Sequence, residues 1–128
     1  MNKEQYVTFE VAKLLKEKGF DWECNTYLYT INVYNYGVEP CRFQINDSKN
    51  SELASDKMTA PTQQMACRWL RKEKGIHILP EISEVKENPK YYCMIWKTST
   101  LESFIIELFD SYEDAIEAAL QYCLTNLI

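Results

Sequence analysis

The chain has 128 residues, of which 46% are hydrophobic and 26% are charged, and its formal net charge is −5 at pH 7. This size and composition predict a single globular domain over residues 1–128 and argue against intrinsic disorder. No apolar run reaches the length of a membrane span, and the first residues lack the apolar core of a signal peptide. We therefore expect a cytoplasmic protein with no membrane partner. Residues 91–128 carry the whole net charge, and this acidity makes nucleic acid an unfavourable partner.

Two helices are predicted in the first part of the chain from their cap signals. Thr8 suits the N-cap of the first helix, and Gly19 suits the left-handed residue that often follows a helix. The second helix has a proline suited to its first turn and ends at Gly75 in the same way. We expect these helices at about Thr8–Lys18 and from about Pro61 or Thr62 to Lys74.

A third helix is predicted over the last residues of the chain, after Ser111. Ser111 suits its N-cap, and the helix dipole favours the acidic residues of its first turns. Its apolar residues recur at the i, i+3, i+4, i+7 spacing of a helix with one buried face. That face consists of Tyr112, Ala115, Ile116, Ala119, Leu120, Cys123, Leu124 and Leu127.

The segments between the helices predict an antiparallel sheet. They are rich in tyrosine, isoleucine and valine, and they are separated by residues typical of turns. The polar segment Asn46–Lys57 is predicted to be a flexible loop. The fold class is therefore α+β, an antiparallel sheet of about five strands with three helices on one face, in the order α-β-β-α-β-β-β-α. The expected strands are Thr26–Tyr34, Cys41–Ile45, Ile76–Ile82, Tyr91–Lys97 and Ser103–Phe109.

Two neighbouring predicted strands are apolar on both faces. Within Tyr91–Trp96, one face carries Tyr91, Cys93 and Ile95, and the other face is equally apolar. Helices on one side of a sheet bury only one of these faces. We expect the other face to meet the tyrosine-rich hairpin of this chain, a second subunit or a ligand.

Signals for catalysis and for bound metal ions are absent from the sequence. His77 is the single histidine, the five cysteines form no C-x-x-C pair, and no G-x-S-x-G motif is present. The three glycines form no phosphate-binding loop. We therefore expect a protein that is not an enzyme and holds no cofactor and no metal ion, with reduced cysteines that serve the structure.

Aromatic and basic residues supply the candidate binding site. Tyrosine offers a large contact area with a polar tip, which suits interfaces and ligand pockets. Three basic residues lie on the solvent side of the second predicted helix, where they suit phosphate binding. The candidate residues are Tyr27, Tyr29, Tyr91, Tyr92, Trp96, Arg68, Arg71 and Lys72.

Three segments of the chain are similar to known sequences when they are taken together. They are Val7–Ala12 with Leu14, Leu15 and Gly19–Asp21; Ala60–Gln64 with Trp69–Arg71 and Ile76–Ile78; and Tyr112–Ala115 with Glu117–Leu120 and Tyr122–Leu124. Their order and spacing resemble a group of short, uncharacterised proteins of phages, prophages and mobile elements of Bacteroides-type bacteria. The resemblance implies a phage-related setting and brings no catalytic residue with it.

Three functions follow as hypotheses. The first is a non-enzymatic interaction module that uses an aromatic sheet face to bind a second copy or a host protein. The second is a protein that binds or sequesters a small, nucleotide-like ligand through its aromatic rings and basic residues. The third is a nucleic-acid accessory factor, whose binding would be strongly dependent on salt.

Overall fold

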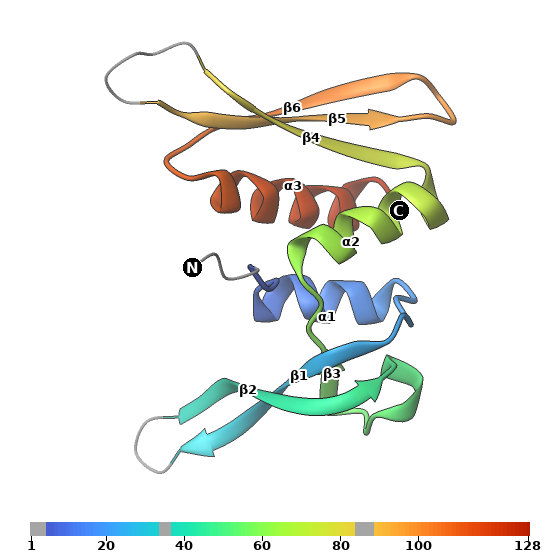
Figure 1. The fold of residues 1–128 in the computed structure, drawn as a ribbon, viewed down its shortest axis with the longest axis vertical. Coiled ribbons are helices and arrows are strands. Elements are labelled where there is room, and N and C mark those ends of the chain that lie inside the picture. The colour runs from blue at the N-terminus through green and yellow to red at the C-terminus, as the bar shows by residue number, and fades with distance from the viewer. Residues whose placement is uncertain (1–4, 34–36, 84–88) are drawn as a thin grey trace.

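The computed structural model describes residues 5–33, 37–83 and 89–128, and it places helices between two β-sheets (Figure 1). Both sheets are antiparallel and have three strands, in the order β2-β1-β3 and β4-β5-β6. Within these residues, no helix is both long enough and apolar enough to cross a membrane. The elements are α1 (Phe9–Glu17), β1 (Cys24–Val33), β2 (Gly37–Ser48), η1 (Asn50–Glu52), β3 (Lys57–Thr59), α2 (Gln63–Trp69), η2 (Leu70–Lys74), β4 (Ile76–Ile82), β5 (Tyr91–Lys97), β6 (Glu102–Phe109) and α3 (Tyr112–Asn126).

The α+β class and the three α-helices are confirmed, whereas the single sheet of about five strands is wrong. The described residues form six strands in two sheets, and the order is α-β-β-β-α-β-β-β-α. The additional strand, β3, pairs with β1 at the end of the predicted loop. The sheets stay separate because the helices lie between them, so each sheet buries one face against the helical layer (Figure 1).

The ends of α1 confirm the predicted cap signals. The Thr8 hydroxyl accepts a hydrogen bond from the Val11 N–H at 3.3 Å. After the helix, Gly19 adopts a φ of 93°, which permits the Phe20 N–H to donate to the Leu15 carbonyl at 2.9 Å. This arrangement satisfies carbonyl groups at the end of the helix and turns Phe20 into the core, where it is 1% exposed.

The second predicted helix has two parts. The Thr62 hydroxyl caps α2 by accepting a hydrogen bond from the Met65 N–H. The chain then continues through η2, a π-helical turn, before Gly75 ends it with a φ of 65°. A π-turn is rare and often marks a functional position in a helix. The predicted end at Lys74 is therefore confirmed, with a wider last turn than an α-helix has.

The third helix, α3, presents its apolar face to the second sheet and to α1. Ser111 is its N-cap, with its hydroxyl accepting from the Asp114 N–H at 3.1 Å. Most of the predicted apolar face is buried, but Tyr112 is 47% exposed because it begins the helix at the edge of that face. The buried members are Ala115, Ile116, Ala119, Leu120, Cys123 and Leu124.

The segment Asn46–Lys57 contains regular structure. Strand β2 extends to Ser48, η1 follows, and β3 begins at Lys57. Asn50 is buried, its side-chain amide donating to the Phe20 carbonyl and accepting from the Thr59 N–H, both at 2.8 Å. The flexibility of this segment stays a prediction. Of the residues typical of turns that separate the predicted strands, those at 35–37 and 86–89 fall mostly outside the described residues.

Candidate functional site

The candidate binding residues lie in three separate places, so they do not form one site. Tyr27 and Tyr29 belong to the first sheet, at the opposite end of the molecule from β4, β5 and β6 (Figure 1). The remaining candidates belong to α2, to η2 or to β5. Sequence spacing did not reveal this separation, because the pairing of strands into sheets depends on contacts between distant residues.

Tyr27 and Tyr29 form a cluster with Lys57 on the outward side of the first sheet. Their neighbours Thr26 and Leu28 point inward and are buried. The Lys57 ammonium nitrogen lies 5.4 Å from the centre of the Tyr27 ring and 5.7 Å from that of Tyr29. Lys57 is therefore a cation–π partner of both tyrosine rings within the chain.

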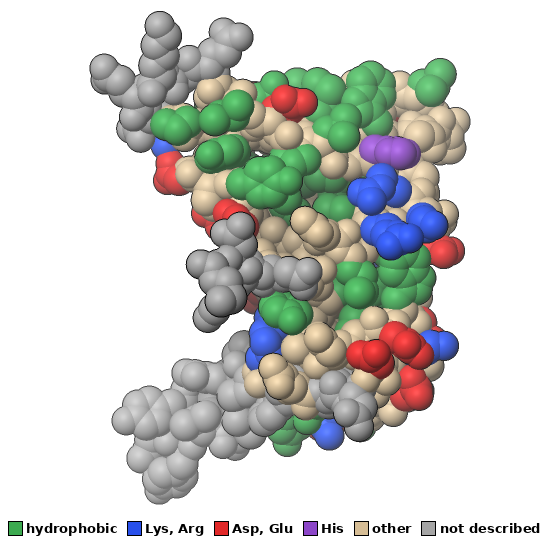
Figure 2. All heavy atoms as spheres, viewed as in Figure 1, with side chains coloured by type: hydrophobic (Ala, Val, Ile, Leu, Met, Phe, Trp, Pro, Cys, Tyr) green, Lys and Arg blue, Asp and Glu red, His purple; other side chains and the backbone are tan. Residues whose placement is uncertain are grey.

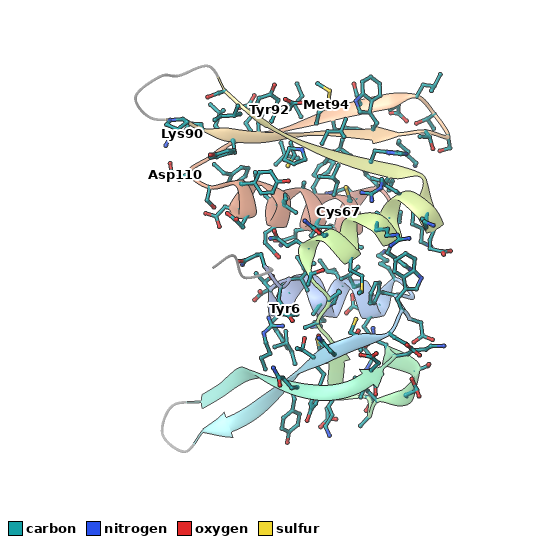
Figure 3. The ribbon with its side chains drawn as sticks, in the orientation of Figure 1. Tyr6, Cys67, Lys90, Tyr92, Met94 and Asp110 are labelled. Carbon is teal, nitrogen blue, oxygen red and sulfur yellow. The ribbon has the colours of Figure 1, made fainter. Side chains whose placement is uncertain are left out.

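The second sheet leaves one face uncovered by any described element, and this surface is called the outer face here (Figure 1). It consists of side chains on β4, β5 and β6 that point away from the helices. Figure 3 shows Tyr92 and Met94 on this side. The tyrosine-rich hairpin of β1 and β2 lies at the other end of the molecule, so the expectation that this hairpin meets the outer face is wrong.

The outer face is arranged in rows across the three strands. Leu79 pairs with Met94, which pairs with Ile105, and the next row joins His77, Trp96 and Ser103. The exposed fractions are 46% for Leu79, 39% for Trp96 and 57% for Ile105. On the inner face of the same strands, Cys93 and Ile95 are fully buried. The two-sided apolar pattern is thus confirmed as one buried face and one exposed face.

A groove of about 300 Å³ lies at one end of the outer face. It is lined by His77, Leu79, Trp96, Lys97, Thr98 and Leu101. Leu101 is 81% exposed, and its φ of 57° lies in the left-handed region that glycine or asparagine usually occupies. Leu101 was not predicted as a site residue, although an apolar residue within the polar turn after Lys97 is a signal in the sequence.

Tyr91 lies on the inner side of β5 and does not share a surface with Tyr92. Its ring packs edge to face against the ring of Tyr112, with centroids 6.3 Å apart and an interplanar angle of 84°. Burial raises the pKa of Tyr112, and the nearby Cys67, Cys93 and Glu113 add to this effect. The Tyr112 hydroxyl therefore stays protonated at neutral pH.

A cleft of about 440 Å³ lies along α2, next to β4 and the start of α3. Arg68 and Arg71 line it, whereas Lys72 does not. The structure therefore brings together two of the three basic candidates and separates the third. Figure 2 shows the lysine and arginine side chains gathered over α2 and η2, beside the single histidine. The other described residues that line this cleft are Trp22, Thr62, Gln63, Gln64, Met65, Cys67, Ile78, Pro80, Tyr112 and Ile116.

A polar junction between the first sheet, α1 and α3 was not predicted. Glu117 on α3 accepts hydrogen bonds from Thr8 and from the side-chain amide of Gln63. Arg42 donates to the Val7 carbonyl at 3.1 Å and stacks on the Tyr6 ring at 4.6 Å (Figure 3). These residues join the first sheet, α1 and α3, so we assign the junction to folding.

The described cysteines are free and buried thiols. Burial raises the pKa of Cys67 and of Cys123 to about 12, and that of Cys24 and Cys93 to about 11. Figure 3 shows Cys67 on α2, on the side toward α3 and the second sheet. Among the described residues, no group of three or more histidine, cysteine or acidic side chains has the arrangement of a metal site. These thiols are poor nucleophiles at neutral pH.

Comparisons with family models, with curated proteins and with solved structures found no match to this chain. The resemblance to proteins of phages and mobile elements therefore stays a prediction.

Proposed function

We propose that the protein is a non-enzymatic interaction module, and that its outer face binds the outer face of a second copy. The observation that carries this proposal is the exposure of apolar side chains in the middle of a sheet. Leu79 and Ile105 flank the central strand and are about half exposed. Large contiguous apolar patches on a soluble domain typically mark interaction surfaces.

The energetic gain from covering this face is substantial. Fully burying a leucine or isoleucine side chain contributes roughly 1.5–3 kcal/mol, so covering a half-exposed one contributes about 1 kcal/mol. Leu79, Trp96, Ile105 and Leu108 all lie in this range of exposure. Together they contribute several kcal/mol to the free energy of association. This contribution is opposed by the loss of translational and rotational freedom when two copies bind.

The size of the outer face suits a sheet-on-sheet contact. Three strands of seven or eight residues span about 25 by 15 Å at the usual spacings. Counted on both copies, such a face supplies most of the roughly 1,000 Å² that a specific interface needs. The exposed side chain of Leu101 extends the contact at the end of the sheet.

The arrangement of the outer face favours a second copy as the occupant. Its apolar row of Leu79, Met94 and Ile105 runs across all three strands. A two-fold axis perpendicular to the strands and passing through this row places the row of one copy against the same row of the other. The same surface then serves both copies, as a two-fold interface requires.

Leu101 provides a second argument for this surface. A left-handed backbone conformation in a residue with a side chain is strained, at a cost of about 1–2 kcal/mol. In a monomer, glycine at position 101 would give a more stable turn than leucine does, because the leucine side chain is 81% exposed. Burial of the leucine in an interface offsets this strain.

The experiment compares two aspartate substitutions by native mass spectrometry. Ile105→Asp places a charge in the centre of the outer face, whereas Gln44→Asp places the same charge at an exposed strand position of the other sheet. We expect dimers for the unchanged protein and for Gln44→Asp, and monomers for Ile105→Asp. Near-UV circular dichroism shows whether each variant is folded. A folded Ile105→Asp protein that still forms dimers contradicts the proposal.

A further inference from the structure

The cleft beside α2 combines two cations with apolar walls. Arg68 and Arg71 line it, and none of the described residues that line it is a carboxylate. Within the described residues, neither guanidinium group forms an ion pair, and the one ion pair there joins Lys90 to Asp110 (Figure 3). Two arginines without an ion-pair partner in a concave site favour the binding of an anion.

Both arginines are placed to act on the same ligand. They are three residues apart on one helical segment, so they lie on the same side of it. Burial raises the pKa of the Cys67 thiol in the wall of the cleft; the charge of Arg71 partly opposes this rise, and Cys93 and Glu117 add to it. Two guanidinium forks match the three terminal oxygens of a phosphate monoester better than the two oxygens of one carboxylate.

Aromatic rings at the same cleft provide a surface for a planar group. Tyr112 lines the cleft, and its edge-to-face contact with Tyr91 holds its ring in place. Trp22 also lines the cleft, and its ring centre is 6.2 Å from that of Phe20. Ile78 adds an apolar wall. A base or another flat ring stacks favourably on such rings.

We propose that this cleft binds a mononucleotide, with Arg68 and Arg71 on the phosphate and an aromatic ring of the cleft on the base. The volume of about 440 Å³ falls within the range of roughly 300–1,000 Å³ for small-molecule sites. The cleft lies on the helical side of the second sheet and the outer face lies on the opposite side. The proposal therefore stands or fails independently of the dimer.

The test measures binding of adenosine monophosphate by isothermal titration calorimetry, with adenosine and inorganic phosphate as separate probes. The double variant Arg68→Gln, Arg71→Gln removes both charges from the cleft. Its matched control is Lys72→Gln, an exposed cation on η2 that does not line the cleft, so the same kind of charge is lost nearby. Both arginines are exposed, and circular dichroism confirms that each variant keeps its fold.

We expect adenosine monophosphate to bind the unchanged protein and the Lys72→Gln variant with similar affinity. The double variant should bind it roughly tenfold more weakly or worse, because charge-assisted hydrogen bonds are lost. Tyr112→Leu should weaken binding of adenosine monophosphate and leave that of inorganic phosphate unchanged. The proposal is overturned if the unchanged protein does not bind adenosine monophosphate, if Lys72→Gln weakens binding as much as the double variant, or if inorganic phosphate binds equally well.

Discussion

The Glu117 carboxylate accepts hydrogen bonds from both the backbone N–H and the hydroxyl of Thr8, at 3.2 and 3.0 Å, although the two residues are 109 positions apart. Thr8 is the N-cap of α1, so a side chain from α3 completes the start of another helix. Burial raises the pKa of Glu117, and hydrogen bonds from Gln63 and Thr8 partly oppose this rise. The junction therefore depends on pH.

The first prediction concerns this pH dependence. Because folding raises the pKa of Glu117 above its ordinary value of 4.5, the folded state binds this proton more tightly than the unfolded state does. The stabilising contribution is complete below that ordinary value and is lost as the pH rises through the folded pKa. Glu117→Gln removes this contribution. In urea titrations, the unfolding free energy of the unchanged protein relative to Glu117→Gln should fall as the pH is raised from 4.5. A relative stability that grows with pH contradicts this account.

The second prediction concerns Asn50. Its buried amide makes two hydrogen bonds, to the Phe20 carbonyl and from the Thr59 N–H. Asn50→Ala leaves both groups without a partner, which should cost about 2–4 kcal/mol of unfolding free energy. Lys49→Ala, at the neighbouring exposed position, should change it by less than about 0.5 kcal/mol. Urea unfolding measures both, and equal losses would show that Asn50 has no special role.

The third prediction compares the two left-handed glycines. A Cβ atom on Gly75 would lie 2.6 Å from the Thr98 hydroxyl oxygen, whereas one on Gly19 would meet nothing within 4 Å. Gly19→Ala should therefore lower the free energy of unfolding by about 1 kcal/mol, which is the cost of placing a residue with a Cβ atom at positive φ. Gly75→Ala should lower it by more, because the clash with Thr98 is added. Adding Thr98→Ala should recover part of the loss at Gly75. Thermal unfolding of the three variants tests this ranking, and a larger loss at Gly19 contradicts it.

The fourth prediction concerns thiol reactivity. Burial raises the pKa of Cys67 and Cys123 to about 12, so their thiolate fraction at neutral pH is minute. In a Cys41→Ser background, the remaining four cysteines should react slowly with a disulfide reagent in the folded protein. They should react at once after denaturation. Rapid labelling of any of the four in the native state would contradict the burial described here.

Local signals predicted the helix ends well, because a cap depends on a few neighbouring residues. Thr8, Ser111, Gly19 and Gly75 all adopt the expected roles. The division into two sheets was not predictable, because it depends on which strands meet after the helices pack. The role of Asn50 carried no sequence signal, since a buried asparagine and an exposed one look alike in a polar segment.

The candidate site was predictable in its residue types and not in its geometry. Alternation along β5 separates Tyr91 from Tyr92, but it does not tell which one points to the helices. The basic residues of the second helix were correctly placed on its solvent side, whereas the cleft that selects Arg68 and Arg71 over Lys72 is formed with β4 and α3. Such a selection needs the packed structure.

The fifth prediction separates stability from assembly at Leu101. Leu101→Gly relieves the strain of a φ of 57° and should keep or raise the thermal stability of the monomer. It also removes an apolar side chain from the proposed interface and should weaken the dimer. Thermal unfolding at low protein concentration and native mass spectrometry measure the two effects. A variant that loses stability and keeps its dimers contradicts the assignment.

The central claim is that the outer face of β4, β5 and β6 is covered by a second copy. Sedimentation velocity of the unchanged protein over a wide range of concentration tests it most directly. The account predicts a concentration-dependent shift from the monomer to a species of twice its mass. A single monomeric species at every concentration would contradict the account and would leave the exposed Leu79, Trp96 and Ile105 without the proposed partner.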